Sequence, residues 1–334
     1  MCSHMKTVGL TYDLKTDYQF KDGDPADANA EFDHPNTIEN ISSALESCGF
    51  KVERIGNVSR LLERLNNPNV DIVFNISEGI TAGRNRESQV PILLEMAGIP
   101  YVGSDALTLG IALDKIMAKK VFISESVPTP KFFEVKSLNG LLDTDHLRFP
   151  LIIKPRFEGS SKGLSEKSRV QDSEGLRRQA ELILNTYKQP ALVEEFISGQ
   201  EFTVAVIGND PGQVMPVVQV KIDGRLQLDS EFYTFARIIS DRLEYVCPAP
   251  IDNNLYRKIQ DITLRAYNSV DCRDFGRVDF RVDNQGNPYV LEINPLPCLS
   301  VEDIFPLIAK EIGISYPEII GRILDSALKR YNLN

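Results

Sequence analysis

Short apolar and alternating runs divide the first third of the chain into strands and helices. We predict strands over 6–11, 51–55, 70–75 and 100–102. Between them, apolar residues recur at helical spacing over 35–48, 58–65 and 88–96. Strand–helix alternation at this spacing predicts a doubly wound parallel sheet, whose ligands bind beyond the carboxyl ends of the strands. The loop 75–86 lies at such an end, and an ordinary surface loop is the alternative interpretation of it.

The remaining two thirds combine further helices with strands that pair in antiparallel fashion. We predict strands over 150–155, 191–197, 201–207 and 214–221, and helices over 111–124, 253–269, 304–312 and 317–331. The first of these helices is expected to begin near Asp114-Lys115. Residues 13–30 are polar and lack periodicity, which predicts a long loop. Residues 231–244 are ambiguous, and we interpret them as a mobile segment over a site. The length predicts two or three domains, and we divide the chain at 5–107, 108–198 and 199–334.

Two alternating runs near the end of the chain predict a β-hairpin that carries oxygen ligands. GRVDFRV (276–282) and PYVLEIN (288–294) flank a turn-forming DNQG. Asp279 lies on the first strand, while Glu292 and Asn294 share one face of the second. Two carboxylates and an amide oxygen suit Mg²⁺ held together with substrate phosphates. Arg277 adds a permanent cation beside them. A half-exposed hairpin with solvated charges is the alternative.

A glycine- and serine-rich turn directly follows Lys154, at the end of the strand 150–155. This turn, RFEGSSKG (156–163), can close its backbone N–H groups on a phosphate, and the serine hydroxyls add donors. It is not a P-loop, because the GxxxxGK[ST] spacing is absent. On the strand 191–197, Glu194 or Glu195 is a candidate acceptor of a hydrogen bond from an adenine amino group.

Charge and cysteine usage narrow the classes of partner. The 334-residue chain has a net charge of −10 and a pI of about 5.0, which argues against nucleic acid or an anionic membrane as the main partner. Its five cysteines are scattered without metal-ligand spacing, and no apolar stretch approaches membrane-spanning length. We therefore expect a cytoplasmic protein that acts on small molecules.

Three segments follow one another in a specific order: KPRFEGSSKGLS (154–165), LVEEFISGQEFTVAV (192–206) and GRVDF with YVLEIN (276–294). Together they resemble the ATP-grasp superfamily and, within it, the D-alanine–D-alanine ligase family. The resemblance implies the ATP-grasp fold, with an N-terminal doubly wound α/β domain and two α+β domains that clamp ATP. It also implies an ADP-forming carboxylate–amine ligase that joins two amino-acid-like substrates through an acyl phosphate, uses Mg²⁺ or Mn²⁺, and forms a homodimer.

The resemblance further implies roles for individual residues. The nucleotide phosphates would be held by Lys115, Lys154, Glu158, Gly159, Ser160 and Ser161. Adenine would contact Glu194, Glu195, Phe196 and Ile197, ribose would contact Glu201, and Arg237 would stand for a phosphate-binding lysine of a mobile loop. The metal ligands would be Asp279, Glu292 and Asn294. The catalytic groups would be Arg277, Ser160 and Lys154, with Arg277 stabilising the reacting centre.

The chain departs from the family's pattern in both substrate subsites. The opening motif, a glycine pair followed by S-x-E-R-E-V-S, is absent, so Glu31 and Asp33 are candidates for binding the first substrate's ammonium. Further substrate-site residues are predicted at Arg86, Glu87, Cys298, Leu299 and Asp303. Arg86 and Glu87 stand where the family has two acids. Cys298 replaces a glycine whose N–H contributes to the oxyanion site, and Asp303 replaces a serine that meets the acceptor's carboxylate.

An aspartate at position 303 would repel a free carboxylate, so we expect an acceptor with an extra amine or without a carboxylate at that place. Two alternatives stay open at this point. One is a D-alanine–D-alanine ligase of peptidoglycan precursor synthesis. The other is an ATP-binding sensor or scaffold without turnover, against which the joint presence of both lysines, the three metal ligands and Arg277 argues.

Overall fold

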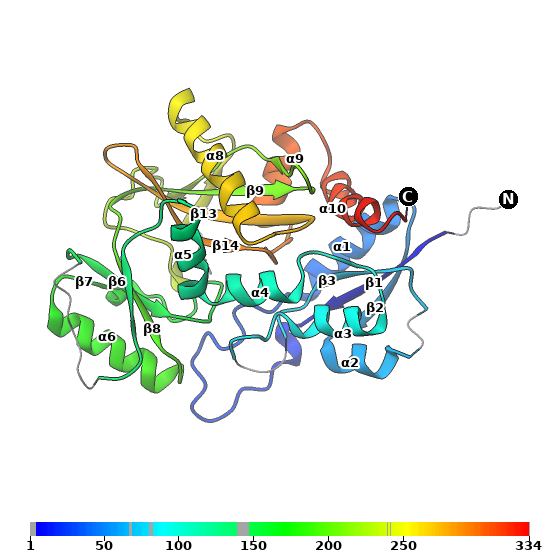
Figure 1. Cartoon of the computed structure of the whole chain (residues 1–334), viewed down its shortest axis with the longest axis horizontal. Coiled ribbons are helices and arrows are strands. Elements are labelled where there is room, and N and C mark those ends of the chain that lie inside the picture. The colour runs from blue at the N-terminus through cyan, green and yellow to red at the C-terminus, as the bar shows by residue number, and fades with distance from the viewer. Residues whose placement is uncertain are drawn as a thin grey trace.

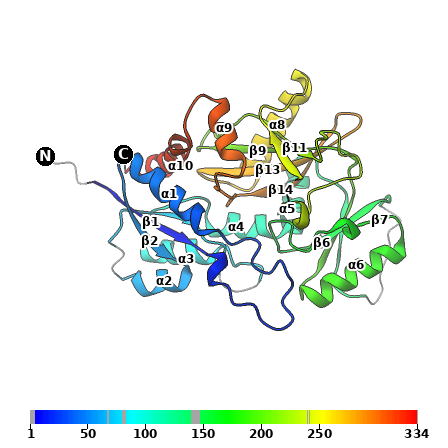
Figure 2. The same cartoon turned by 180° about the vertical axis from the view of Figure 1, so that it is seen from behind.

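The computed structural model describes residues 5–66, 69–79, 83–138, 147–238, 240 and 242–333. These residues form three β-sheets with helices packed on them (Figure 1). The sheet of the N-terminal region and the sheet of residues 132–195 lie at opposite ends of the molecule, and the sheet that contains the predicted hairpin lies between them (Figures 1 and 2). Within the described part of the chain, no helix is both long enough and apolar enough to cross a bilayer.

The N-terminal sheet is parallel, which confirms the predicted doubly wound arrangement. Its strands run in the order β2 (Lys51–Gly56), β1 (Thr7–Tyr12), β3 (Ile72–Ile76) and β4 (Tyr101–Val102). On one face, Val8 and Leu10 pack in a core that includes α1 (Pro35–Ser47). On the other face, Val73 packs in a core with α2 (Val58–Arg64) and α3 (Gln89–Ala97). Apolar side chains on both faces explain the unbroken apolar runs of these strands.

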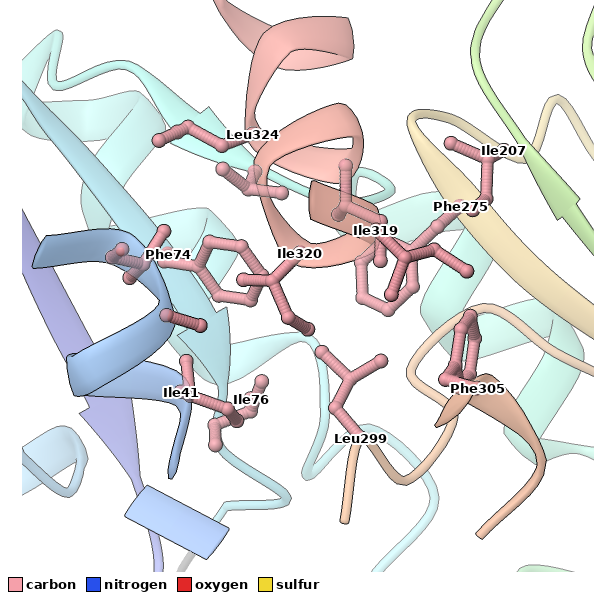
Figure 3. Close-up of a cluster of buried hydrophobic side chains, with 14 of the residues drawn as sticks. Ile41, Phe74, Ile76, Ile207, Phe275, Leu299, Phe305, Ile319, Ile320 and Leu324 are labelled. Carbon is pink, nitrogen blue, oxygen red and sulfur yellow. The ribbon is translucent and has the colours of Figure 1, made fainter. Parts of the chain in front are cut away.

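A helix from the other end of the chain completes the first of these cores. Ile320 of α10 (Tyr316–Arg330) packs with Phe74 of β3, and Phe275 of the hairpin sheet lies in the same cluster (Figure 3). Phe305 of α9 (Ile304–Glu311) joins them. The cluster therefore connects the N-terminal sheet to the sheet that carries the hairpin.

The sheet at the far end is antiparallel. Its order is β5 (Phe132–Val135), β8 (Ala191–Glu195), β6 (Leu151–Pro155) and β7 (Arg169–Val170). Helix α6 (Ser173–Thr186) covers one face, where Leu176 and Ile183 pack with Ile153 and Val193. The two predicted strands are confirmed, whereas β5, β7 and α6 were not predicted. Two short 3-10 helices span Lys15–Asp17 and Glu166–Ser168.

The helix predicted over 111–124 with its start near Asp114-Lys115 is confirmed from Lys115 onward, whereas the helix before it was not predicted, and the two helices meet at Asp114. These are α4 (Ala106–Leu113) and α5 (Lys115–Ser124). Asp114 has φ −81° and ψ 89°, outside the helical region, and its carboxylate accepts a hydrogen bond from the Met117 N–H at 3.2 Å. An aspartate in this position caps the second helix and separates it from the first.

The hairpin sheet has the order β12 (Leu243–Val246), β11 (Val218–Ile222), β9 (Gly199–Ile207), β13 (Phe275–Asp283) and β14 (Pro288–Asn294), with β10 (Gln213–Val214) paired to β9. Helix α8 (Asn253–Ser269) covers it at the predicted position. The predicted strand 214–221 is two strands, because Pro216 has no N–H for the ladder. The segment 231–244 includes α7 (Phe235–Ile238) and the start of β12, while residues 239 and 241 lie outside the described residues.

Candidate active site

The β13–β14 hairpin brings the predicted oxygen ligands together. Its register pairs Asp279 with Glu292 and Arg277 with Asn294 across the two strands. On the other side of β13, Thr203 of β9 is paired with Asp279 and donates its hydroxyl to Asp279 Oδ1 at 2.6 Å. Thr203 was not predicted, because its position depends on the register between strands far apart in sequence. The predicted cluster of hard oxygen ligands is therefore present in space.

Both carboxylates of this cluster are paired with cations. Lys115 Nζ lies 2.6 Å from Glu292 Oε2, and Arg277 donates two hydrogen bonds to Asp279 at 3.1 and 3.0 Å. Burial acts to raise the pKa of Glu292, but Lys115 and Lys154 outweigh it and lower that pKa to about 2. Glu292 is thus ionised at any pH at which the protein would be studied.

A buried charge cluster on the neighbouring sheet contains a residue that the sequence did not reveal. Glu194 of β8 bridges Lys154 and Lys119, with both Nζ–Oε distances at 2.7 Å. Lys119 and Glu194 are 0% and 1% exposed. The spacing of Lys119, four residues after Lys115 on α5, was the available signal, since it puts both ammonium groups on one helix face. The Glu194 carboxylate holds the two lysines, so the candidate adenine contacts shift toward the following residues.

Those following residues line a pocket of about 130 Å³ next to the lysines. Glu195, Phe196, Ile197 and Glu201 all lie in its wall. Glu201 is buried and its Oε2 is 2.9 Å from Arg281 Nη1. The apolar and polar lining has the character of a small-molecule pocket. Arg237, on α7, is buried and paired with Glu231 and, at 3.3 Å, with Glu166.

The glycine- and serine-rich turn closes the same pocket and is held by the acidic N-terminal loop. Glu31 Oε1 accepts a hydrogen bond from the Gly159 N–H at 2.5 Å, and Lys162 Nζ lies 3.1 Å from Glu31 Oε2. Asp27, also in the loop, accepts from the Gly163 N–H at 2.8 Å. The sequence predicted a long loop here, but the contacts of the loop with this turn were not predicted. The carboxylates of Glu31 and Asp27 thus accept hydrogen bonds from backbone N–H groups of the turn, and such N–H groups can also bind phosphate.

Within the turn, the remaining predicted residues are held in place by their backbone conformation and by ion pairs and hydrogen bonds. Ser160 and Ser161 have positive φ angles of 46° and 55°, a conformation that persists only where the surroundings fix it. Glu158 is tied to Lys162 at 2.5 Å and to Gln189 at 2.7 Å. Ser160 lies at the junction between the 130 Å³ pocket and a larger cavity, since it lines both.

That larger cavity, of about 820 Å³, has an acidic wall on the N-terminal side. Carboxylate oxygens of Glu31, Glu78 and Glu87 lie within 4.8 Å of one another, and Arg86 pairs with Glu31 and, at 3.7 Å, with Glu87. Burial and the neighbouring carboxylates raise the pKa of Glu78, and burial raises that of Glu87 to about 7 despite Arg86. Glu78 is an addition to the predicted set.

Asp33 differs from Glu31 in its availability to a substrate. Glu31 is fully engaged by the turn and Arg86, whereas the backbone of Asp33 pairs with residues 13 and 15 and its side chain lines the large cavity. Burial raises the pKa of Asp33 to about 7, with Lys15 partly opposing and Asp13 reinforcing the shift. Of the two candidates for the ammonium of the first substrate, the geometry therefore favours Asp33.

The segment after β14 forms the opposite wall of the cavity. Cys298 is exposed and lines the cavity. The Leu299 side chain instead packs in the core next to Ile320 (Figure 3). The Leu299 carbonyl accepts a hydrogen bond from the Tyr316 hydroxyl at 2.6 Å. Asp303 accepts a hydrogen bond from the Ile304 N–H at 2.6 Å, and its Oδ2 is 3.7 Å from Arg277 Nη1. Asp303 lines both the cavity and the 130 Å³ pocket.

Comparison with known proteins gives a consistent picture. The family model described as D-ala D-ala ligase C-terminus matches residues 127–325, more than half of the chain. The chain is 36% identical to the uncharacterized protein y4sG of Sinorhizobium fredii, over 88% of each chain, and 34% identical to the D-alanine–D-alanine ligase of Bordetella avium, over 70% of this chain and 72% of that one. The fold matches the D-alanine–D-alanine ligase of Bacillus anthracis complexed with ATP, with a TM-score of 0.77 at 22% identity, covering 97% of this chain and 98% of that one. The chain therefore belongs to the D-alanine–D-alanine ligase family and is an ATP-dependent ligase of that family.

Proposed function

We propose that the chain phosphorylates a carboxylate substrate with ATP and couples the acyl phosphate to an amine, releasing ADP and phosphate. A carboxylate is a poor electrophile, and an acyl phosphate has a good leaving group. Phosphoryl transfer needs positioning and charge neutralisation more than protein nucleophiles. The observation that carries the proposal is the convergence of Lys115, Lys154 and Arg277 with Asp279 and Glu292 around one pocket.

The donor set of the hairpin fits a magnesium ion. Asp279 and Glu292 face each other with oxygen donors, and Asn294 adds an amide oxygen that accepts from the Leu296 N–H at 3.0 Å and keeps a second lone pair. We propose these three residues as its ligands. Bound magnesium would neutralise charge on the nucleotide phosphates. Lys115 and Lys154 are placed to bind phosphate oxygens, and the turn 158–163 is placed to keep water away.

Arg277 is proposed to act in the second half-reaction. When the amine attacks the acyl phosphate, negative charge develops on the former carbonyl oxygen, and a fixed cation nearby stabilises it. Arg277 is held by Asp279 and lies between the nucleotide pocket and the cavity, so it is fixed in place before the reaction.

Replacing Arg277 with lysine should lower the rate of amide formation by about 10²-fold, because the charge stays but the two-point contact with Asp279 is lost. Steady-state kinetics with calorimetric ATP titration would measure this. We expect the affinity for ATP to change by less than tenfold. A variant with a normal amide-forming rate would contradict the assigned role.

The pKa of Asp33 gives a second prediction, for the binding of the first substrate. Asp33 has to be ionised to attract an ammonium group, so the donor KM should fall about tenfold between pH 6 and pH 8, as the carboxyl loses its proton near pH 7. The D33N variant should have a higher KM that no longer changes through this range. A wild-type KM that is independent of pH would rule out this role for Asp33.

Substrate identity is best tested by phosphate release from ATP and Mg²⁺ with D- and L-amino acids, singly and in pairs, followed by mass spectrometry. A product from a pair other than two D-alanines supports a ligase of divergent specificity. A second candidate, D-alanine–D-alanine ligase itself, is favoured by the names of relatives such as that of Bordetella avium. Formation of the dipeptide from D-alanine alone would establish it.

We further propose a cytoplasmic homodimer that associates through the N-terminal domain. Leu62 of α2 and Ile92 and Met96 of α3 are exposed apolar side chains on that domain, which supports an association surface there.

A further inference from the structure

The N-terminal end of α9 already holds a carboxylate that belongs to the protein itself. Asp303 is the N-cap residue, and its Oδ1 accepts the first free N–H of the helix, that of Ile304, at 2.6 Å. N–H groups at a helix start favour an anion, and here the anion is built in. Asp303 also lies 3.7 Å from Arg277. The start of α9 and Arg277 are the two groups that would attract a substrate carboxylate here. Each therefore already lies next to the carboxylate of Asp303.

Among the described residues, the segment 295–303 that forms this wall carries no basic side chain of its own. Within the described residues, Arg277 is the one cation at ion-pair distance from Asp303, and it is also bonded to Asp279. The nearby hydroxyls of Tyr233 and Tyr245 contact each other, and burial raises the pKa of both, so they stay neutral. A carboxylate brought next to Asp303 would meet a like charge and an arginine already paired with Asp279 and Asp303, at a cost. An ammonium would meet a partly buried carboxylate, whose pKa is raised by burial against the opposing effect of Arg277, and would stabilise its charged form.

We propose that the acceptor is an amine with no carboxylate on the carbon next to its reacting nitrogen, and that it carries there a second ammonium, which Asp303 binds. This inference rests on the proposed function and names the acceptor class of that reaction. The uncharged nitrogen attacks the carbonyl carbon of the acyl phosphate and forms the C–N bond. The C–O bond to phosphate breaks, phosphate leaves with the electron pair, and the nitrogen loses one proton to solvent.

Three small amines that differ only in one group test this directly. They are alanine, alaninol and 1,2-diaminopropane, which carry a carboxylate, a hydroxymethyl and an aminomethyl group on the same amine-bearing carbon. The donor is first identified with hydroxylamine, which traps an acyl phosphate as a hydroxamate without needing the acceptor subsite. With that donor, we expect kcat/KM to be highest for the diamine and at least about tenfold lower for alanine, as a close ion pair allows.

Two variants of Asp303 and one control distinguish the effect of its negative charge from its role as the N-cap of α9. Asp303→Asn keeps a side-chain cap and should remove the preference for the diamine over alaninol. Asp303→Ser should raise the relative use of alanine. Glu311→Gln removes an exposed carboxylate at the other end of α9, outside the cavity lining, and should leave the preference unchanged.

The outcomes distinguish this inference from the proposed function. Hydroxamate formation together with a preference for alanine in the wild type would overturn the acceptor assignment and leave the ligase reaction standing. An unchanged preference in Asp303→Asn would also overturn it. No hydroxamate with any D- or L-amino acid donor would overturn the proposed function and, with it, this inference.

Discussion

Glutamine in place of Glu292 is expected to lower phosphate release by about 10³-fold, the upper end of the loss that follows removal of one charged group from a reacting centre. The change removes a proposed metal ligand and leaves Lys115 without its carboxylate partner at 2.6 Å. Because the pKa of Glu292 is about 2, the carboxylate is ionised throughout the working range, and the loss should be the same at pH 6 and pH 9.

The control for this variant is Glu311→Gln, at the exposed end of α9, which should keep the wild-type rate. Circular dichroism and ATP titration would show that Glu292→Gln is folded and still binds nucleotide. Raising the Mg²⁺ concentration should restore part of the rate if the lost group is a metal ligand. A rate above a tenth of wild type at ordinary Mg²⁺ would contradict the assignment.

Removing the carboxylate between the two buried lysines should have the largest effect on stability. In Glu194→Gln, Lys119 and Lys154 lose the partner that lies 2.7 Å from each, and breaking a buried ion pair in this way costs about 3–5 kcal/mol of the free energy of unfolding. Burial lowers the pKa of Lys119 to about 8, so this lysine can release its proton. The destabilisation should therefore be smaller at pH 9 than at pH 7.

Urea denaturation at both pH values would measure these differences. Glu181→Gln, on the exposed face of α6 in the same region, is the matched control and should change the free energy of unfolding by less than about 0.5 kcal/mol. A loss below about 1 kcal/mol for Glu194→Gln at pH 7 would show that the lysines find other partners.

Sequence reasoning succeeded where the determinants are local. Helix α8 was predicted at its observed bounds, because Asp252 caps it and apolar residues recur through it at helical spacing. The hairpin was predicted because alternation and a turn sequence define it within a few residues. The pairing of Asp279 with Glu292 then follows from the hairpin alone.

The missed features depend on contacts between distant parts of the chain. Helix α4 was missed, although the start of α5 near Asp114 was predicted, and the non-helical backbone of Asp114 is fixed partly by Arg156, forty-two residues further on. The partnership of Lys119 with Glu194 is set by how α5 packs against another sheet. The hydrogen bond from the Gly163 N–H to the Asp27 carboxylate likewise joins residues that are 136 positions apart in the sequence. Pattern analysis can mark such residues as candidates but cannot pair them.

Packing of α10 on the N-terminal sheet has a consequence for biosynthesis. One face of that sheet is covered partly by residues 319–328, and Lys6 bonds to the backbone of Leu333. A ribosome adds about 5–20 residues per second, so this apolar face stays without its last helix for roughly 15–65 seconds after its first strand emerges. The N-terminal region therefore cannot reach its final form before residues 319–328 have emerged from the ribosome, and chaperones that shield apolar surface should act on it until then.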